Sequence, residues 1–194
     1  LRNIMKNPIS LCPLLSAYIL FSAMPVSAAD EDERHHNAHT HGQAKLNIVL
    51  DQGELFVALE TPAVNILGFE HAPNTTTQQA VLKQANITLS DSQNVVQVTG
   101  GDCKLMAQDI DMPFTDKHQE NSEVEHDDHE DHEGHTDVHA EYTFKCANES
   151  LVKSLNVSVF KHFGAFKGID TVWVIGIHQR KLHLTPDATK IELR

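Results

Sequence analysis

The amino-acid sequence predicts an α+β fold that is mostly antiparallel β with one main helix. Segments in which apolar and polar residues alternate recur along most of the chain, as half-buried strands require. The stretch at 75–85 has the capping and composition of a helix. The stretch at about 115–139 holds little besides Asp, Glu, His and small polar residues, and it cannot bury enough apolar surface to fold. We therefore expect a single domain over 42–194 with a disordered His/Asp/Glu-rich insertion.

The first part of the chain, 1–29, has the organisation of a secretory signal peptide. Arg2 and Lys6 precede an apolar run, Ile9–Met24, and small residues suited to cleavage follow it. The run has 16 residues, whereas a membrane-spanning helix needs about 20. Cleavage is therefore favoured over an uncleaved anchor. We expect an exported protein with no membrane attachment after cleavage, which then begins with a flexible His-rich leader over 30–41.

The charge excludes some partners and favours others. The chain has 27 acidic and 15 basic residues and a formal net charge of −12, and removal of a signal peptide would take away two more positive charges. A protein this acidic repels nucleic acid and anionic lipid and attracts cations. The chain also has 14 histidines, many of them clustered. The composition therefore favours metal binding.

The folded part is expected to begin with a hairpin over 42–60. Apolar residues alternate in two strands, 44–50 and 55–59, and the Asp51–Gln52–Gly53 segment between them is a turn signal. The next segment, 63–73, contains several apolar residues and then a proline. We expect it to be irregular or briefly helical and to pack on the sheet.

The helix and two further strands follow. Thr75–Thr77 offers a helix cap before Gln78–Ala85, although the sequence does not show how far beyond this the helix continues. Gly100–Gly101 ends the pattern, and a strand is expected at about Cys103–Ala107. After the insertion, alternation resumes in a strand at Glu141–Cys146.

The C-terminal part is expected to be β-rich. Apolar alternation predicts strands around 155–159, 172–177, 182–184 and 191–193. Polar residues predict the turns between them at 164–170, 179–181 and 186–190.

Two cysteines, Cys103 and Cys146, remain once the signal peptide is removed. In an oxidising compartment, two cysteines favour one disulfide. The alternative is that both thiolates bind zinc. Neither cysteine has a second cysteine or a histidine at the short spacing of common zinc motifs, so the disulfide is the preferred interpretation.

The strongest chemical signal is a string of five histidines within 14 residues, at spacings of three and four. Neutral imidazole is a good ligand for zinc, copper and nickel, and the carboxylates between the histidines can complete a coordination shell. Nothing in the pattern fixes one geometry, so several exchanging sites are expected. The alternative is a solvated acidic linker with incidental histidines. The predicted ligands are His126, His129, His132, His135 and His139.

A second, more ordered metal site is predicted from two motifs. His39 and His41 are two residues apart, so they face the same way if the first strand starts early. His71 follows Glu70 in a segment expected to pack on the hairpin. These three histidines would form the site, with Glu70 as a ligand or as a partner that orients one. Alternatively, His39 lies in the flexible leader and His71 is a loop or core histidine.

Enzyme activity is not expected. The zinc-protease motif HExxH is absent, as are nucleophile-elbow, phosphate-loop and dinucleotide-binding patterns. A disulfide would remove both mature thiols as nucleophiles. One catalytic alternative is a zinc hydrolase with a water on the ordered three-histidine site. The isolated histidines near the C-terminus are assigned no role.

Several segments resemble one known family. They are His39–Ile48, Gly68–Pro73, the acidic histidine insertion that follows, and the C-terminal strands from Phe160–Phe163 to Leu184–Pro186. They resemble the ZrgA-type periplasmic zinc-binding proteins over nearly the whole mature chain. The resemblance implies a zinc protein of the Gram-negative periplasm that assists a high-affinity ABC zinc importer, passing metal to its solute-binding protein. It also gives weight to the positions His39, His41, Glu70 and His71.

Two further classes of function compete with zinc capture for uptake. A substrate-binding protein that itself docks on a permease usually has two α/β lobes, which the β-rich pattern argues against. A periplasmic metal buffer for zinc or copper tolerance would show the same histidine string, so composition does not separate it from uptake. Zinc is favoured over copper because methionine and thiolate ligands are lacking around the histidines. The oligomeric state stays open.

Overall fold

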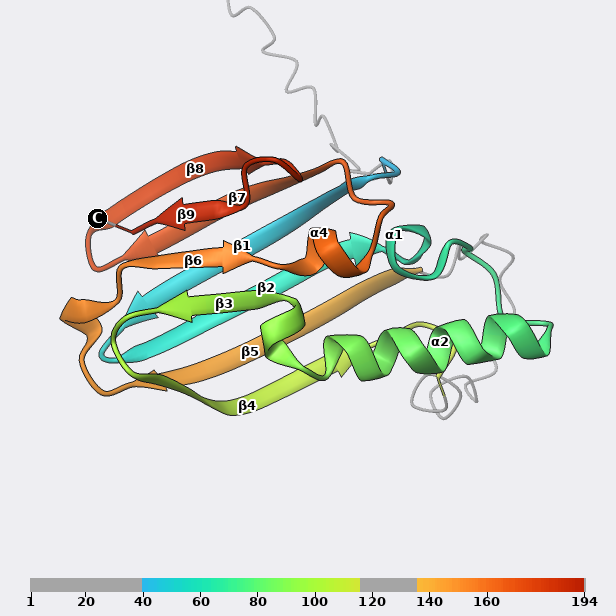
Figure 1. Ribbon diagram of the computed structural model, residues 1–194, viewed down its shortest axis with the longest axis horizontal. Coiled ribbons are helices and arrows are strands. Elements are labelled where there is room, and N and C mark those ends of the chain that lie inside the picture. Colours follow the sequence, from blue (N-terminus) through green and yellow to red (C-terminus); the bar gives the residue numbers. More distant parts are fainter. Residues whose placement is uncertain (1–39, 116–135, 194) are drawn as a thin grey trace, which may run out of the picture. The chain divides into compact units, whose positions relative to one another are not determined.

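The computed structural model describes residues 40–115 and 136–193, and two β-sheets account for most of them (Figure 1). The larger sheet has six strands, in the order β4 (Cys103–Asp111), β5 (Asp137–Cys146), β2 (Glu54–Pro62), β1 (Gln43–Asp51), β7 (Gly168–Ile175) and β8 (His178–Leu184). The smaller sheet has the order β3 (Val96–Thr99), β6 (Ser154–Val157) and β9 (Lys190–Glu192). The predicted fold class is therefore confirmed. The expected signal peptide, leader and most of the insertion lie outside the described residues.

Neighbouring strands pair antiparallel throughout, except that β1 and β7 are parallel. The helices are α1 (Ala63–Leu67), α2 (Thr76–Leu89) and α4 (Val159–His162), with short 3₁₀ turns at Ser92–Asn94 and Glu149–Leu151. No helix in the described ranges is long and apolar enough to cross a membrane.

The predicted first hairpin is confirmed, and its turn explains its register. Gln52 and Gly53 connect β1 to β2, and both have positive φ, at 51° and 75°. Two central residues of this kind make the tight turn whose twist matches that of antiparallel strands. Asp51 therefore pairs with Glu54, and the same register continues to Lys45 and Glu60 at the other end.

The predicted main helix is also confirmed. The Thr75 side chain accepts a hydrogen bond from the Gln78 backbone N–H, so it caps α2 as expected. The helix continues to Leu89, which is fully buried. It thereby carries the chain across the sheet, towards the 3₁₀ turn and β3.

One hydrophobic core lies between the two sheets. Alternate residues of β1 and β2 point into it, and Leu46, Ile48 and Leu55 are each at most 1% exposed. The smaller sheet lies over this face in Figure 1 and contributes Leu155 and Ile191 to the same core. Burial of these apolar side chains is the main force that holds the sheets together.

The opposite side of the six-stranded sheet, here named the open face, is exposed. It carries the other residues of β1, which are Lys45, Asn47, Val49 and Asp51, and all four are exposed. Apolar and polar residues therefore alternate along β1, as the sequence pattern predicted.

Several boundaries differ from the sequence prediction, and Val159, which was expected in a strand, begins α4. The insertion was expected to extend to residue 139, but β5 already begins at Asp137, because Asp137, Val138 and His139 pair with β2. This part of the strand was not predicted, because the residues around Val138 are polar, although Val138 itself is fully buried. The turn expected at 179–181 is wrong, because these residues belong to β8.

The actual β7–β8 turn lies at Gly176 and Ile177. Gly176 has φ +56°, and Ile175 pairs with His178 across the turn. Ile177 belongs to the apolar run in the sequence, yet its side chain is 95% exposed. The β7 strand also begins at Gly168, within the polar segment that was expected to be a turn.

The expected disulfide is present. Cys103 and Cys146 are direct partners in the β4–β5 ladder, and a disulfide joins them. The two cysteines are 43 residues apart in the sequence, and closing a loop of that length stabilises a fold by about 4 kcal/mol on chain-entropy grounds.

The hydroxyl of Tyr142 provides a test of how α2 is attached to the sheet. It lies fully buried on β5 and donates a hydrogen bond to the Leu89 carbonyl oxygen at 2.6 Å. Burial raises the pKa of this hydroxyl, and the negative charge of Asp91 adds to the effect. Tyr142→Phe should lower the free energy of unfolding by about 1–2 kcal/mol in urea titrations, because the carbonyl is left without its donor.

Thr143→Val is the matched control, since it removes a hydroxyl from the same strand. Equal losses in both variants would contradict the assigned role of Tyr142. The wild type should also lose stability relative to Tyr142→Phe above about pH 10, because there the unfolded chain releases a tyrosine proton that the folded chain retains.

Candidate functional site

The histidine-rich insertion connects the two strands of one hairpin. The β4 strand ends at Asp111 and β5 begins at Asp137, so the 25 residues between them leave and re-enter the sheet at one point. Asp111 pairs with His139 in the last rungs of the ladder. The disulfide joins the same two strands at their other end. The insertion is therefore anchored at its base by the β4–β5 ladder, whose register shifts once between Leu105 and Ala107.

The two family-like motifs lie at the same end of the sheet as the insertion. The pairing of Pro62 with Asp137 places the end of β2 beside the start of β5. The first turn of α1 is also attached there, because the Ala63 N–H donates a hydrogen bond to the Thr136 carbonyl at 2.7 Å. The β1 strand starts at this end as well, since Lys45 pairs with Glu60.

Asn65 holds these segments together from inside the protein. It is 2% exposed, and its side-chain oxygen accepts a hydrogen bond from the Gly42 N–H at 2.7 Å. Its amide nitrogen donates to the Gln43 carbonyl and the Thr61 hydroxyl, each at 2.9 Å. The sequence analysis missed this residue, although a lone Asn in an apolar helix such as Ala63–Leu67 is a signal, because a buried amide needs partners.

Gly42 also has to be glycine. Its φ of +85° is in the left-handed region, and a Cβ there would lie 2.9 Å from carbons of the Lys167 side chain. The turn at Gly42 therefore fixes the direction in which His41 leaves the start of β1.

His41 lies next to Glu70. Its Nε2 is 3.3 Å from Glu70 Oε1, and the two side chains are 65% and 36% exposed. They come from segments that are well separated in the sequence, and the left-handed Gly68 ends α1 between them. An imidazole and a carboxylate at this distance are two donors of the kind that zinc accepts.

His71 is held differently. Its ring stacks on Phe69, with centroids 5.4 Å apart. Its Nδ1 lies 2.9 Å from the Ala72 carbonyl oxygen, so that nitrogen carries the proton, and Nε2 faces the amide nitrogen of Gln78 at 3.5 Å. His71 would have to leave Gln78 before it could bind a metal through Nε2.

A row of titratable side chains crosses the open face at this end. Each member is paired by strand register with the next, and the acidic members alternate with histidine or lysine. The members, from β4 to β8, are Asp111, His139, Glu60, Lys45, Asp170 and His183. Within the row, Lys45 Nζ is 2.8 Å from Glu60 Oε1, and His183 Nδ1 is 2.7 Å from Asp170 Oδ1.

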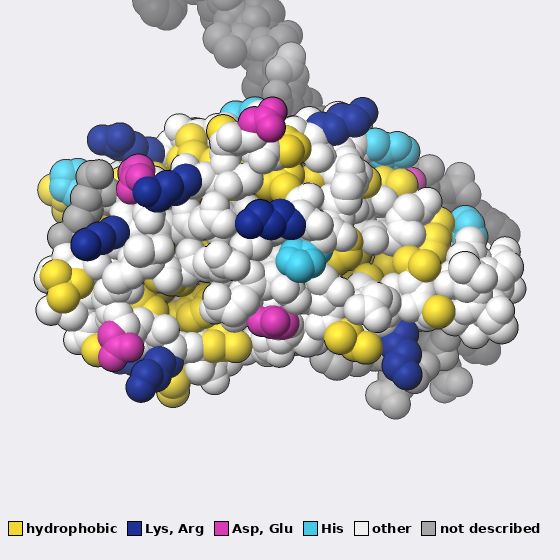
Figure 2. Space-filling model, viewed as in Figure 1, with side chains coloured by type: hydrophobic (Ala, Val, Ile, Leu, Met, Phe, Trp, Pro, Cys, Tyr) yellow, Lys and Arg dark blue, Asp and Glu magenta, His cyan; other side chains and the backbone are white. Residues whose placement is uncertain are grey.

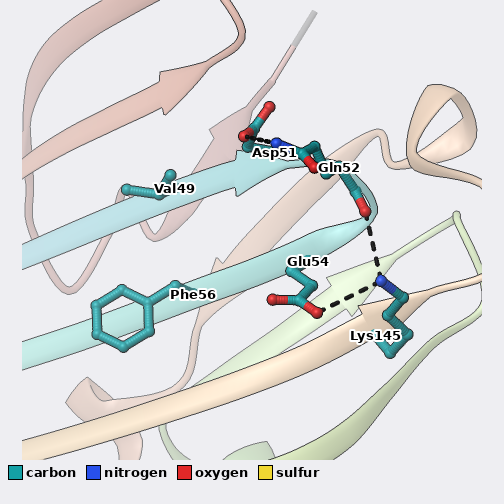
Figure 3. A pocket seen from close by; sticks show the side chains of 6 residues that line it. All are labelled: Val49, Asp51, Gln52, Glu54, Phe56 and Lys145. Atoms are coloured by element: carbon teal, nitrogen blue, oxygen red, sulfur yellow. Dashed lines mark hydrogen bonds and ion pairs between the residues drawn. The ribbon is translucent and has the colours of Figure 1, made fainter.

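A shallow hollow lies on the open face at the other end of the sheet (Figure 3). Its lining includes Val49 and Phe56, and Lys145 contacts both the Glu54 carboxylate and the Gln52 carbonyl, each at 3.4 Å. Its lining residues include the carboxylates of Asp51 and Glu54 but no histidine and no cysteine, which are the commonest zinc ligands in proteins.

The predicted metal ligands thus fall into three groups. The described ranges contain no cluster of three or more His, Cys, Asp or Glu side chains arranged around a metal position. His41 and Glu70 lie together, whereas His71 faces Gln78 and His139 is exposed on β5. The remaining predicted ligands lie outside the described residues, namely His39, His126, His129, His132 and His135.

The described residues define a class of protein, a β-rich domain in which one hairpin of the larger sheet is interrupted by a histidine- and carboxylate-rich insertion. Residues 38–193 match the family described as ZrgA family zinc uptake protein. This match includes both motifs, the insertion and the C-terminal strands. The chain therefore belongs to the ZrgA family of zinc uptake proteins, as the resemblance implied. No curated protein matches the chain.

The contribution of Asn65 can be measured directly. Asn65→Ala leaves three polar groups without their partner in the interior, so the free energy of unfolding should fall by about 2–4 kcal/mol. Asn47→Ala on the exposed side of β1 is the matched control and should change stability by less than about 0.5 kcal/mol. The anchoring role would be disproved by equal unfolding midpoints for the two variants.

Proposed function

We propose that this protein captures zinc outside the cytoplasm and passes it to the solute-binding protein of a high-affinity ABC zinc importer. The observation that carries the proposal is that the histidine string forms the loop of the β4–β5 hairpin, anchored at its base by the ladder. Membership of a zinc uptake family favours uptake over a role in metal tolerance.

The chemistry of the loop suits capture followed by release. Its histidines recur every three or four residues with carboxylates between them, so many different sets of about four ligands can surround one ion. Such sets exchange because no single geometry is imposed on them. A site that exchanges can give up its metal to a more rigid site on a partner.

The sheet end adds fixed charges beside the loop. Asp109, Asp111 and Glu141 lie on the last rungs of β4 and β5, on the same face as His139. Carboxylates gathered on one side of a surface raise the local concentration of cations. These carboxylates would add to the negative potential that attracts zinc to this end of the sheet.

A second metal site at the start of β1 is part of the proposal. His41 and Glu70 supply two donors 3.3 Å apart, and His39 is two residues earlier in the same motif. We assign His39, His41 and Glu70 to this site, with His71 outside it because its ring is held by Phe69 and Gln78.

The proposed compartment is the periplasm, and the protein is proposed to bind metal rather than to catalyse a reaction. The signal-like segment 1–29 supports export. The disulfide between Cys103 and Cys146 supports an oxidising compartment, because cytosolic thiols are kept reduced. It also leaves neither thiol available as a zinc ligand or a nucleophile.

Replacing His126, His129, His132 and His135 by Asn tests the capture step. Calorimetric titration at micromolar zinc should show loss of most of the zinc bound by the wild type. The wild type should itself bind more weakly as pH falls from about 7.5 to about 5.5, because protons compete for the imidazole lone pairs. The control is a double variant, His162→Asn with His178→Asn, which changes two exposed histidines outside the insertion and should leave zinc binding unchanged. Full retention of zinc by the Asn variant would refute the proposal.

The same question can be asked in cells with a deletion of 118–135. The deletion has to stop there, because Thr136 accepts a hydrogen bond from Ala63 and β5 begins one residue later. Growth under zinc chelation should fall while the protein remains folded. Induction by zinc starvation would support uptake, and induction by excess zinc would support tolerance instead.

The second site makes a separate prediction. His41→Ala and Glu70→Gln should each weaken one class of zinc sites, by about 10-fold or more, in competition with a zinc-binding dye. His71→Ala should leave that class unchanged, and His178→Ala serves as a surface control. If His71→Ala were as damaging as His41→Ala, the assignment of these ligands would be wrong.

A further inference from the structure

Strand β8 lies at the edge of the larger sheet and carries basic but no acidic side chains, whereas the protein as a whole has a net negative charge. It pairs with β7 on one side and ends the order of the larger sheet as the structure describes it. Its seven residues include His178, Arg180, Lys181 and His183 and no carboxylate. The whole segment 152–193 carries six Lys and Arg against three Asp and Glu, whereas the chain overall carries 15 against 27.

The cations lie on both sides of this edge. Arg180 is on the core side, where its guanidinium lies 5.8 Å from the centroid of the Trp173 ring. Lys181 is exposed on the open face, because it pairs with Val172, which in turn pairs with Asn47. A chain running beside β8 would therefore meet a positive charge whichever way its side chains point.

Apolar and concave surface adjoins the edge. The side chain of Ile177, at the tip of the β7–β8 turn, is 95% exposed. On the open face, Lys45 and Lys181 lie on the border of a hollow whose lining also includes Val172, Leu182 and Asp170, and the carboxylate of Asp170 is paired with His183 of β8. Figure 2 shows the other side of the molecule, where Lys and Arg side chains gather around the end that carries β8 and β9.

We propose that the edge of β8 binds an extended acidic segment of another polypeptide as an added strand. The unpaired side of an edge strand offers backbone N–H and C=O groups, which an extended peptide can satisfy. Carboxylates on alternate sides of that peptide would pair with Arg180 and Lys181. Carboxylates elsewhere on this chain would repel the same segment and so direct it to β8.

Charged side chains on an edge strand can instead serve only to prevent aggregation. The two readings predict different results. A purely protective edge binds no peptide. An edge that serves as a docking site binds an acidic peptide, provided that the backbone N–H groups of the peptide are free to form hydrogen bonds. The inference does not depend on zinc capture, so its failure would leave the proposed function unchanged.

The test uses a fluorescent peptide of about nine residues, rich in Glu, Val and Thr, with carboxylates on both sides of its extended form. Wild-type protein should raise its anisotropy in a saturable way. Arg180→Glu with Lys181→Glu should weaken binding roughly 10-fold, because two opposite-charge pairs become like-charge pairs. Methylation of alternate peptide nitrogens should also abolish binding.

Lys83→Glu with Lys104→Glu is the matched control, since it changes the net charge equally at two exposed positions away from β8. If the variant with reversed charges does not fold, Arg180→Gln with Lys181→Gln takes its place, and circular dichroism confirms that this second variant is folded. No binding by the wild type, equal binding of the methylated peptide, or equal loss in the Lys83/Lys104 control would each overturn the proposal. So would light scattering that shows a wild-type dimer which the β8 variant loses, because the occupant would then be a second copy.

Discussion

The β4–β5 ladder is the constraint on which the rest of the site depends. Its backbone hydrogen bonds run from the disulfide between Cys103 and Cys146 to the pairing of Asp111 with His139. A loop of about 25 residues is costly to order on its own, and the ladder brings its two ends together without any contribution from the loop. The sequence of the insertion is therefore not constrained by the need to bring these two strands together.

Asn65 has the corresponding anchoring role for the segments that carry His41 and Glu70. Its three hydrogen bonds join α1 to the start of β1 and the end of β2 in the interior, where a missing partner is expensive. His41 and Glu70 then meet at the surface without being buried themselves. Each segment that carries candidate metal ligands is thus positioned chiefly by residues that are not themselves candidates.

Local patterns in the sequence predicted the helices and strands that are determined by neighbouring residues. The alternation in β1 and β2 and the Thr75 cap identified the first hairpin and the main helix. The start of β5 was not predicted, because its polar residues are held in the strand by pairing with β2. Pairing between distant segments leaves no local pattern in the sequence. The β7–β8 turn was misplaced because Ile177, although apolar, is exposed at the turn.

The candidate site was predictable in part. The residue types of the two motifs suggested a site containing His41 and Glu70, and these two residues do lie together. The ring of His71 turns towards Phe69 and Gln78, which depends on the loop conformation after Gly68. The charged row from Asp111 to His183 could not be predicted, because it follows from the register of six strands, including the parallel pair β1 and β7.

The position of the insertion also makes the binding loop and the scaffold separable. Doubling the length of a loop between two fixed ends costs only about 0.6 kcal/mol. Histidines can therefore be gained or lost between Asp111 and Asp137 with little effect on the sheet. Even a proteolytic nick in that stretch would leave the two fragments covalently joined through Cys103 and Cys146 and interleaved as neighbouring strands. The number of histidines in the insertion can thus change over evolution independently of the sheet.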